Sequence, residues 1–436
     1  MSEQDWMKKA DAMMHHETPR LDPEKLRSFV DRFIQQKERF LKCVAVNGSP
    51  LYAFDETALV KRVQEFRGAF EKVFSEIHFF YAMKSNSHPF MIKTVIAQGC
   101  GIDVSSGEEL KKALAHSPKE VVFSGPGKTE EELELACRNA ENVTVLIDSF
   151  GELKRLSSMA ALTGVRIRAG VRLTVDERGL WRKFGIPLKR LSAFFEEAKR
   201  SPHIDFCGMQ FHTSWNMDAS QQTAFLKRLG ETLAGFDKAD LKRIRFLDIG
   251  GGYWPFEGEW LQPAATPEGK LKECLESSHG FVDGLDHRCV DALPIDRFAT
   301  ALSEALKAYI FPHVRPIIFC EPGRWISQAG MHILLRVVDK KDDQLVITDG
   351  GIQAVGWERF EHDYFPLINL SRPALKEREC LVCGSLCTPH DLWGYSYFGQ
   401  SIEVGDVLLL PTQGAYTYSL RQEFIKAIPK DAFLEP

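Results

Sequence analysis

The sequence predicts an α/β protein in which a (β/α)8, TIM-like barrel is followed by a β-rich domain. From position 75 to position 321, apolar runs of strand length alternate with amphipathic segments of helix length. Eight such units in about 250 residues match the size of a (β/α)8 barrel. Polar and charged residues gather where these runs end, which is where such a barrel carries its functional side chains. Because a count of strands does not show that the sheet closes, a doubly wound open sheet is the alternative.

The predicted barrel strands are the eight apolar runs Ile77–Ala82, Cys100–Val104, Glu120–Ser124, Val143–Asp148, Val165–Leu173, Ile204–His212, Ile244–Ile249 and Pro316–Glu321. Helices are predicted between them at Gly107–Ala115, Thr129–Asn139, Leu188–Arg200, Ser220–Phe236 and Ile295–Phe311. The residues that follow or end the runs are Lys84, Asp103, Ser124–Gly127, Arg172, His212, Asp248–Gly252 and Glu321–Arg324. A barrel brings these carboxyl ends together at one mouth, so strand count and polar positions support the same fold.

After Gly330 the pattern becomes that of a β-rich domain, either a barrel or a sandwich. Two apolar runs, Ile333–Val338 and Leu345–Thr348, flank the polar segment Asp339–Asp343 and predict a hairpin. Further strands are predicted at Cys380–Cys383, at Ile402–Leu410 with a turn over Val404–Val407, and at Tyr416–Leu420.

The amino-terminal part is predicted to join the β-rich domain. Leu21–Cys43 reads as one or two helices, and Val44–Ala53 reads as a strand added to that domain. We therefore expect an N-terminal extension at 1–20, a segment at 21–50 that packs with the β-rich domain, the barrel at 51–330 and the β-rich domain at 331–436.

The composition is that of a soluble globular protein of two domains. The chain has 436 residues, and this length exceeds the usual size of a single core. Apolar residues make up 44% of the chain and charged residues 26%, as in soluble globular proteins. A net charge of −5 gives no reason to expect nucleic acid or an anionic membrane as partner. Met1–Arg20 is polar and lacks the apolar core of a signal peptide, and no run is long enough to cross a bilayer. We expect a cytoplasmic protein.

The segment Tyr81-Ala-Met-Lys84-Ser-Asn86 carries the most informative lysine of the chain. It follows an apolar run, so Lys84 is predicted where a buried strand meets its loop. An amine there is partly desolvated, which lowers its pKa and makes it a candidate nucleophile for a Schiff base. A lone lysine in such a place is more often a solvated surface residue, so the interpretation of Lys84 depends on the other motifs of the chain.

Lys84 is followed by His212, the glycines Gly250, Gly251 and Gly252, Glu321-Pro-Gly-Arg324, Cys387 and Gly414-Ala-Tyr416. In this order the motifs resemble those of the fold-type III pyridoxal-phosphate (PLP) decarboxylases, which act on ornithine, diaminopimelate and arginine. The resemblance runs from about Leu51 to about Tyr418. It implies α-decarboxylation of a small amino-acid substrate through a lysine Schiff base and a quinonoid intermediate, with PLP as the cofactor. It also implies a homodimer with shared active sites.

The resemblance gives each cofactor-binding residue a role. Lys84 would form the Schiff base, and Asp103 would favour its protonated form or cap the following helix. His212 would stack on the cofactor ring, with Arg172 nearby. The phosphate would lie on the glycine loop Gly250–Gly252, held also by Arg324 and Tyr416.

Glu321 would pair with the ring nitrogen and keep it protonated. An alanine-racemase-type site has an arginine there, so Glu321 disfavours a racemase. Alone, Glu321 could form a structural ion pair with Arg324, and His212 could be an ordinary strand histidine. A degenerate homologue with a regulatory role would have lost Lys84, the glycine loop or Cys387, and none is missing.

Cys387 matches a cysteine that enters the neighbouring subunit's active site in this family and handles protonation of the substrate carbon. Around the substrate, however, this chain departs from the family pattern. It has Thr388 in place of an acid, Phe365-Pro366 in place of Arg-Pro, Ser214-Trp215-Asn216 near His212, and Arg182-Lys183 before Phe184.

The candidate substrate-binding residues are Arg182, Thr388, His390 and Asp391. A site that gains Arg and Trp and loses an acid is expected to suit an amino-acid conjugate, such as a citrate-linked diamino acid in siderophore biosynthesis. The alternative substrates are free diamino acids, namely ornithine, lysine or diaminopimelate.

The thiols of Cys380, Cys383 and Cys387 with His390 have a composition that also occurs in zinc sites. Cys380 and Cys383 lie in a predicted strand, where odd and even residues point to opposite faces. We therefore expect no metal, and interpret Cys380 and Cys383 as small core residues.

Overall fold

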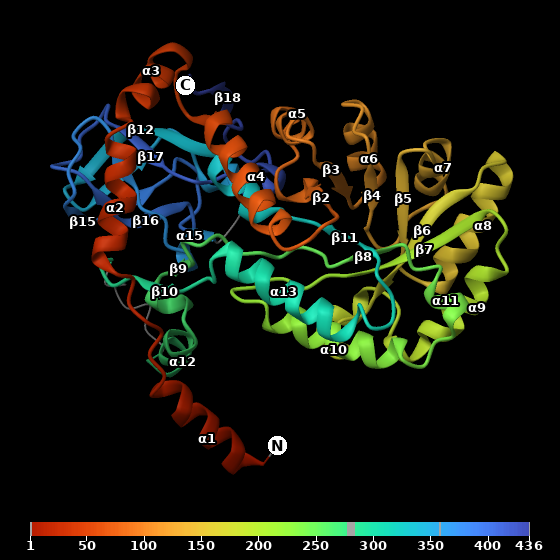
Figure 1. The fold of residues 1–436 in the computed structure, drawn as a ribbon. Helices are drawn as coiled ribbons and strands as arrows, with labels where there is room; N and C mark the ends of the chain where they lie inside the picture. Colours follow the sequence, from red (N-terminus) through yellow and green to blue (C-terminus); the bar gives the residue numbers. More distant parts are fainter. Residues whose placement is uncertain (1, 277–283, 357–358, 436) are drawn as a thin grey trace. The chain divides into compact units, whose positions relative to one another are not determined.

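The computed structural model describes residues 2–276, 284–356 and 359–435. The chain divides into two compact units (Figure 1). The barrel unit consists of residues 59–256 and 292–327, and the β unit consists of residues 1–58, 257–291 and 328–436. The predicted barrel boundary, 51–330, thus differs from this division at both ends. It also contains an internal segment, 257–291, that the division assigns to the β unit.

The barrel unit contains a closed barrel of parallel strands in the order β11-β2-β3-β4-β5-β6-β7-β8. The strands are β2 (Ile77–Ala82), β3 (Gly101–Val104), β4 (Val121–Phe123), β5 (Val143–Ile147), β6 (Ile167–Leu173), β7 (Ile204–Phe211), β8 (Phe246–Asp248) and β11 (Ile317–Cys320). Each lies within one of the eight predicted runs, and the closure confirms the barrel rather than the open sheet.

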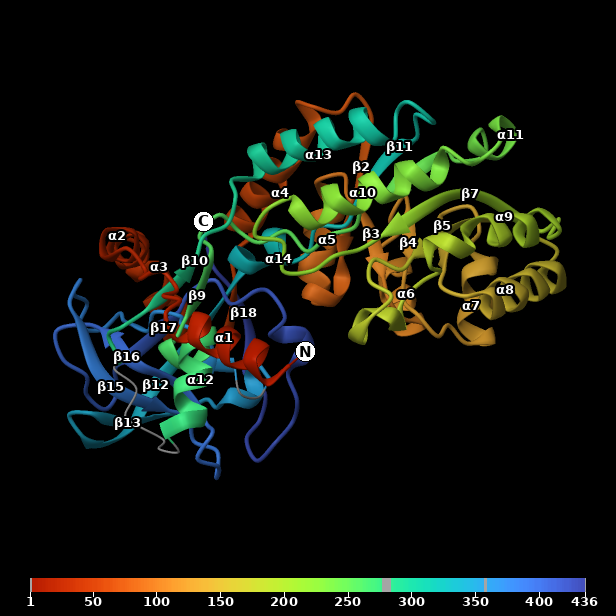
Figure 2. The ribbon, with the colours of Figure 1, turned by 90° about the horizontal axis from the view of Figure 1, so that it is seen from below.

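Helices surround the barrel strands (Figure 2). They are α4 (Glu56–Glu71), α5 (Pro89–Ala97), α6 (Gly107–Leu114), α7 (Glu130–Arg138), α8 (Phe150–Thr163), α9 (Leu191–Lys199), α10 (Ser220–Leu233), α11 (Lys238–Leu241), α13 (Ile295–Tyr309) and α14 (Arg324–Ser327). Several begin at a capping side chain directly after a strand, as where Ser106 accepts the Glu109 N–H. Within the described part of the chain, no helix has both the length and the apolar character needed to span a membrane.

The barrel interior has an apolar layer below a polar layer. Phe80, Val122, Leu146, Cys207, Phe246 and Phe319 form the apolar cluster. A Cβ on Gly170 or Gly208 would collide with the Phe246 ring, so these two glycines leave room for that ring inside the barrel. Because side chains alternate along a strand, the residue two positions further points inward as well. This register places Asp248 above Phe246 and Glu321 above Phe319 in the polar layer.

The β unit is built on a sheet with strand order β13-β15-β16-β14-β17-β12-β1-β18. Its strands are β1 (Leu51–Phe54), β12 (Met331–Asp342), β13 (Leu345–Thr348), β14 (Ile368–Asn369), β15 (Glu377–Cys383), β16 (Leu392–Phe398), β17 (Val407–Leu410) and β18 (Lys430–Phe433). An additional pairing of β13 with β12 closes a ring of six strands, so the β-rich domain is confirmed as barrel-like. A two-stranded sheet of β9 (Glu259–Leu261) and β10 (Arg288–Val290), together with α12 (Pro267–Glu276) and α15 (Arg359–His362), completes the unit.

Two local predictions in the β-rich domain are corrected. The hairpin exists, but β12 continues through the predicted polar turn to Asp342. In the run from Ile402, the predicted turn into a strand is confirmed, with the turn at Val404–Gly405 and the strand at Val407–Leu410. Tyr416–Leu420 is not a strand: Tyr416 has a φ of 56°, which a β ladder does not accommodate, and residues 418–420 form a 3-10 turn.

The amino-terminal residues belong to the β unit. They form α1 (Glu3–Met14), α2 (Pro23–Ile34) and α3 (Lys37–Asn47), so two helices occupy the predicted helical segment. The predicted strand at Val44–Ala53 is confirmed only in its last part, as β1, which pairs with β12 and β18. A short stretch after α1 pairs with β10 through Arg20 and Arg288.

Glu268 of α12 holds this stretch. Its carboxylate accepts the Thr18 N–H at 2.7 Å and the Thr18 hydroxyl at 3.2 Å. Burial alone would raise the pKa of Glu268, but the hydrogen bonds from Thr18 outweigh it and lower the pKa to about 2. Because the folded pKa is depressed, this contribution to stability is present above the ordinary range near pH 4.5 and is lost as the pH falls toward 2.

Replacing Glu268 with glutamine should release residues 1–20 from α12 and cost about 1–3 kcal/mol at pH 7. Limited proteolysis should cut the variant before Leu21 faster than the wild type. Glu273→Gln, an exposed position on the same helix, is the control. Equal cleavage of the Glu268 variant and the wild type at pH 7 would contradict this role of Glu268.

Candidate active site

Lys84 lies at the carboxyl end of β2, in a short 3-10 turn formed by Met83–Ser85. Its Nζ is 2.7 Å from Oδ2 of Asp103, the residue in the same inward position at the end of β3. The Lys84 side chain is one-third exposed, whereas the Asp103 side chain is fully buried. The amine is therefore held by a buried carboxylate at a position that a small molecule can reach.

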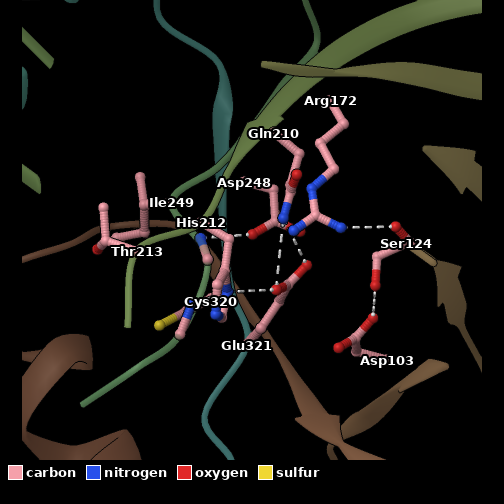
Figure 3. A network of polar contacts seen from close by, with 12 residues as sticks. Asp103, Ser124, Arg172, Gln210, His212, Thr213, Asp248, Ile249, Cys320 and Glu321 are labelled. Carbon is pink, nitrogen blue, oxygen red and sulfur yellow. Dashed lines mark hydrogen bonds and ion pairs between the residues drawn. The ribbon is translucent and has the colours of Figure 1, made fainter. Parts of the chain in front are cut away.

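Asp103 continues into a network with Ser124 and Arg172 (Figure 3). The Ser124 hydroxyl donates to Oδ1 of Asp103, and Nη1 of Arg172 donates to the Ser124 backbone oxygen at 3.0 Å. Burial and the charge of Glu321 raise the pKa of Asp103, while Lys84 and Ser124 act in the opposite direction. Arg172 also lies over the Phe184 ring, 4.4 Å from its centroid.

Glu321 directly follows β11 and is buried in the same layer, with 1% of its surface exposed. Nε2 of Gln210 lies 3.3 Å and 3.5 Å from its two carboxylate oxygens, and Nδ1 of His212 lies 3.3 Å from Oε2. Burial alone would raise the pKa of Glu321, but His212 and the charge of Lys84 outweigh it and lower the pKa to about 2. The direction of this shift favours the ionised form of Glu321 at neutral pH.

His212 follows β7 and contacts two partners through one nitrogen. Nδ1 is also 3.2 Å from the Gly251 N–H, so in any one tautomer it either accepts from Gly251 or donates to Glu321. Burial lowers the pKa of His212, which favours the neutral ring. The Trp181 ring lies 6.4 Å from the His212 ring, between their centroids.

The glycine loop follows β8 and packs directly against neighbouring backbone. Gly250 and Gly252 have φ of 69° and 82°, in the region that favours glycine. A Cβ on Gly251 would meet the backbone oxygen of Glu321, and one on Gly252 would meet that of Thr213. The sequence pattern predicted close approach to a phosphate; in the structure each missing Cβ also makes room for the protein's own backbone.

The segment Ser214-Trp215-Asn216, where the chain departs from the family pattern, is fastened to this loop. The Asn216 N–H donates to the Gly252 oxygen at 3.0 Å, and its Nδ2 donates to the Gly251 oxygen at 3.0 Å. Trp215 is 60% exposed with a φ of 52°, and its ring is 5.9 Å from that of Trp254. Arg324 lies over the other tryptophan, with its guanidinium carbon 4.3 Å from the Trp254 centroid.

Arg182 lies in the loop after β6, in the short helical turn Gly179–Lys183, and its side chain is exposed. It directly follows Trp181, the residue whose ring is near His212. Arg182 is thus close in sequence to a residue of the barrel mouth, and its guanidinium remains available to solvent.

The predicted residues of the β unit are described by themselves. Tyr416 is half-buried, and Cys387 is exposed on the loop between β15 and β16. His390 on the same loop pairs with Glu361, with Nδ1 2.7 Å from Oε1. Thr388 is half-buried.

Asp391 has a clear place in this loop. It is 2% exposed, and its two carboxylate oxygens accept the N–H groups of Ile352 at 2.7 Å and Leu386 at 2.6 Å. A Cβ on Gly384 would collide with the same carboxylate. The carboxylate of Asp391 thus shapes the loop that carries Cys387, and its role toward a substrate stays a prediction.

The cysteine cluster gives no metal site in the described part of the chain, where no group of three or more His, Cys, Asp or Glu side chains has a suitable arrangement. Cys380 is buried, Cys383 is half-buried and Cys387 is exposed. Burial raises the pKa of Cys380 to about 12, which is the behaviour of an inert core thiol.

One residue of the polar layer was not singled out from the sequence, namely Gln210. The sequence could have indicated Gln210, because this residue lies two positions before His212 and therefore on the same face of the strand. The barrel brings together Lys84, Asp103, Arg172, His212, Gly250–Gly252 and Glu321 as predicted. Cys387, Thr388, His390, Asp391 and Tyr416 lie in the other unit.

Comparisons with known proteins agree on one family. Residues 57–328 match the family described as pyridoxal-dependent decarboxylase, pyridoxal binding domain. Diaminopimelate decarboxylase of Vibrio cholerae is 34% identical over 407 residues, covering 86% of this chain and 85% of that protein. The Staphylococcus aureus 2-[(L-alanin-3-ylcarbamoyl)methyl]-2-hydroxybutanedioate decarboxylase is 23% identical over 410 residues, covering 88% and 93%. The structure of M. jannaschii diaminopimelate decarboxylase with L-lysine has a TM-score of 0.71 at 22% identity, covering 90% and 88%, and shows the same fold.

Proposed function

Since this chain belongs to the family of pyridoxal-dependent decarboxylases, we propose that its substrate is an amino acid conjugated to an acid, such as a citrate-linked diamino acid of siderophore biosynthesis. The family fixes the reaction class, an amino-acid decarboxylation with PLP as cofactor. The observation that carries the proposed site is the buried Glu321 beside His212, in the barrel layer that also holds the Lys84–Asp103 pair.

The residues of the barrel mouth fit PLP by their chemistry. Lys84 would hold the cofactor aldehyde covalently through Nζ, and Glu321 would bind the ring nitrogen. The glycine loop offers backbone N–H groups without side chains, which suits a phosphate, and Arg324 supplies a cation. His212 would lie against the ring.

When bound, PLP supplies an electron sink that accepts the electron pair left on Cα as the carboxyl group departs. Glu321, ionised and held by Gln210 and His212, would keep the proton on the ring nitrogen that makes this possible. Asp103 would favour the charged state of the Lys84 nitrogen through their 2.7 Å contact. Cys387 of a second copy would deliver the proton to Cα, which requires a homodimer with shared sites.

The substrate proposal is supported by the loop that carries Cys387. In this family an acid after the cysteine contacts the distal end of a free diamino acid, and here that position is Thr388. The nearby Asp391 carboxylate is occupied by two backbone N–H groups within its loop. Exposed Arg182 next to Trp181 instead offers a cation at the barrel mouth, which favours an anionic substituent.

A relative supports the same substrate class. The name of the Staphylococcus aureus enzyme describes an alanine unit joined through an amide to a hydroxy-dicarboxylate. The Vibrio cholerae relative acts, by its name, on diaminopimelate, which is the main alternative for this chain.

Replacing Thr388 with aspartate should raise kcat/KM for lysine or ornithine by roughly tenfold to a hundredfold, because one charge-assisted contact is worth about 1.5–3 kcal/mol. It should lower kcat/KM for a citryl-diamino acid through like-charge repulsion. Steady-state decarboxylation with both substrate classes measures the change.

Arg182→Ala should lower activity on the conjugate selectively, and Arg178→Ala, an exposed arginine of the same loop, is its matched control. Efficient wild-type turnover of free lysine, ornithine or diaminopimelate, with none on the conjugate, would overturn the substrate proposal and leave the reaction class intact.

A further inference from the structure

Asp248 is a buried carboxyl group whose second oxygen has no partner among the hydrogen bonds of the described residues. It ends β8 and is 0% exposed. Its Oδ1 accepts the Gly250 N–H at 2.8 Å, whereas Oδ2 is buried without an assigned partner. An ionised carboxylate with one bare oxygen is costly in a dry interior, so this oxygen must carry a proton or meet a donor.

Its neighbour in the polar layer is another carboxyl group, Glu321 (Figure 3). Their strands are neighbours: Phe319 lies opposite Asp248 in the parallel pairing of β11 with β8, and the Glu321 N–H donates to the Gly250 oxygen at 2.8 Å. Glu321 already receives the Nε2 of Gln210 from one side and faces His212 on another. Two buried carboxyl groups in one layer repel each other when both are ionised, so a proton on one of them lowers this cost.

The position of the proton follows from the surroundings. Glu321 accepts from Gln210 and faces Nδ1 of His212, while Asp248 has a single backbone N–H. Burial and the charge of Glu321 raise the pKa of Asp248 well above its usual range. With Asp248 neutral, the charges of Asp103 and Glu321 are balanced by the two cations that act on this cluster, Lys84 and Arg172.

We propose that Asp248 is a proton-holding positioning residue: its Oδ2–H donates a hydrogen bond to the Glu321 carboxylate while its Oδ1 accepts the Gly250 N–H. Asp248 thereby joins the glycine loop to the acid that binds the cofactor ring nitrogen. It orients Glu321 and keeps it ionised without adding a second negative charge. The inference rests on the proposed role of Glu321 toward PLP.

Two substitutions test whether Asp248 carries a proton. Asn at position 248 has an oxygen that accepts the Gly250 N–H and an amide that donates to Glu321, so it reproduces both contacts of a protonated aspartate. Ala reproduces neither. Asp248→Ala should weaken PLP binding at least tenfold, and Asp248→Asn should restore PLP affinity to within about threefold of the wild type. Equilibrium titration of PLP into the cofactor-free protein measures both.

Infrared spectroscopy of the cofactor-free protein gives a readout independent of activity. At pH 7 the wild type should show the C=O stretch of a buried carboxylic acid, and Asp248→Asn should lose it. Asp240→Asn should keep this band, because Asp240 is a buried carboxyl paired with Lys199 at 2.6 Å outside the site.

The possible outcomes distinguish a failure of the Asp248 proposal from a failure of the proposed function. An Asp248→Asn variant that binds PLP as poorly as Asp248→Ala would show that a negative charge is needed, and would overturn it. A carboxylic-acid band unchanged in Asp248→Asn would do the same. Failure of the wild type to bind PLP would instead refute the proposed roles of Glu321 and Lys84.

Discussion

Lys84→Ala is expected to reduce decarboxylation more than about a thousandfold, a loss of over ~4 kcal/mol in transition-state stabilisation. The physical reason is that the amine acts covalently, and Lys84 supplies the amine that Asp103 holds at 2.7 Å. The fold should survive, because Lys84 is one-third exposed and its removal leaves Asp103 free to take up a proton. The measurement is single-turnover decarboxylation together with the visible absorption of the lysine-bound cofactor, which the variant should lose.

The attachment point can be read directly. Borohydride reduction of the wild type followed by peptide mass mapping should locate the cofactor on the peptide that contains Lys84. Lys93→Ala, an exposed lysine on α5, is the control and should leave absorption and activity unchanged. Cofactor found on another lysine would place the covalent site elsewhere in the barrel.

Cys387→Ala is expected to lower kcat by roughly 10²–10⁴, the range of a general acid, while PLP stays bound. Misdirected protonation should also produce a transaminated by-product. Cys387 is exposed in its own subunit, which is compatible with a thiol that works in the site of a second copy.

Mixing Lys84→Ala with Cys387→Ala tests the shared site. About a quarter of wild-type activity should return after subunit exchange, because half of randomly assorted dimers are hybrids and each hybrid has one complete site of two. The control for the loss of a cysteine as such is a mixture in which Cys274→Ala takes the place of Cys387→Ala, because Cys274 is another exposed thiol. Absence of recovery in a mixture whose hybrids are seen by native mass spectrometry would contradict shared sites.

The barrel and its mouth could be predicted because the signal is local. Each strand is a short apolar run, and in a parallel barrel every carboxyl end faces the same side. Lys84, Asp103 and Glu321 therefore meet once closure is assumed, without any knowledge of side-chain contacts. The strands of the β-rich domain were harder to predict, because a short strand is defined by the strands it pairs with rather than by its own residues. β12 continues through its predicted polar turn to Asp342, and the positive φ of Tyr416 has no marker in its residue type.

By itself the sequence determined the order of the barrel strands, the residues at their ends and the family chemistry those residues imply, because these depend on side-chain alternation and chain order. Only the tertiary structure decided which of them touch. Closure of β11 onto β2 and β8 brings Glu321 beside Gln210, His212 and Asp248, residues 73 to 111 positions away. The assignment of a proton within such a cluster depends on burial and on neighbouring charges, and both are properties of the folded barrel.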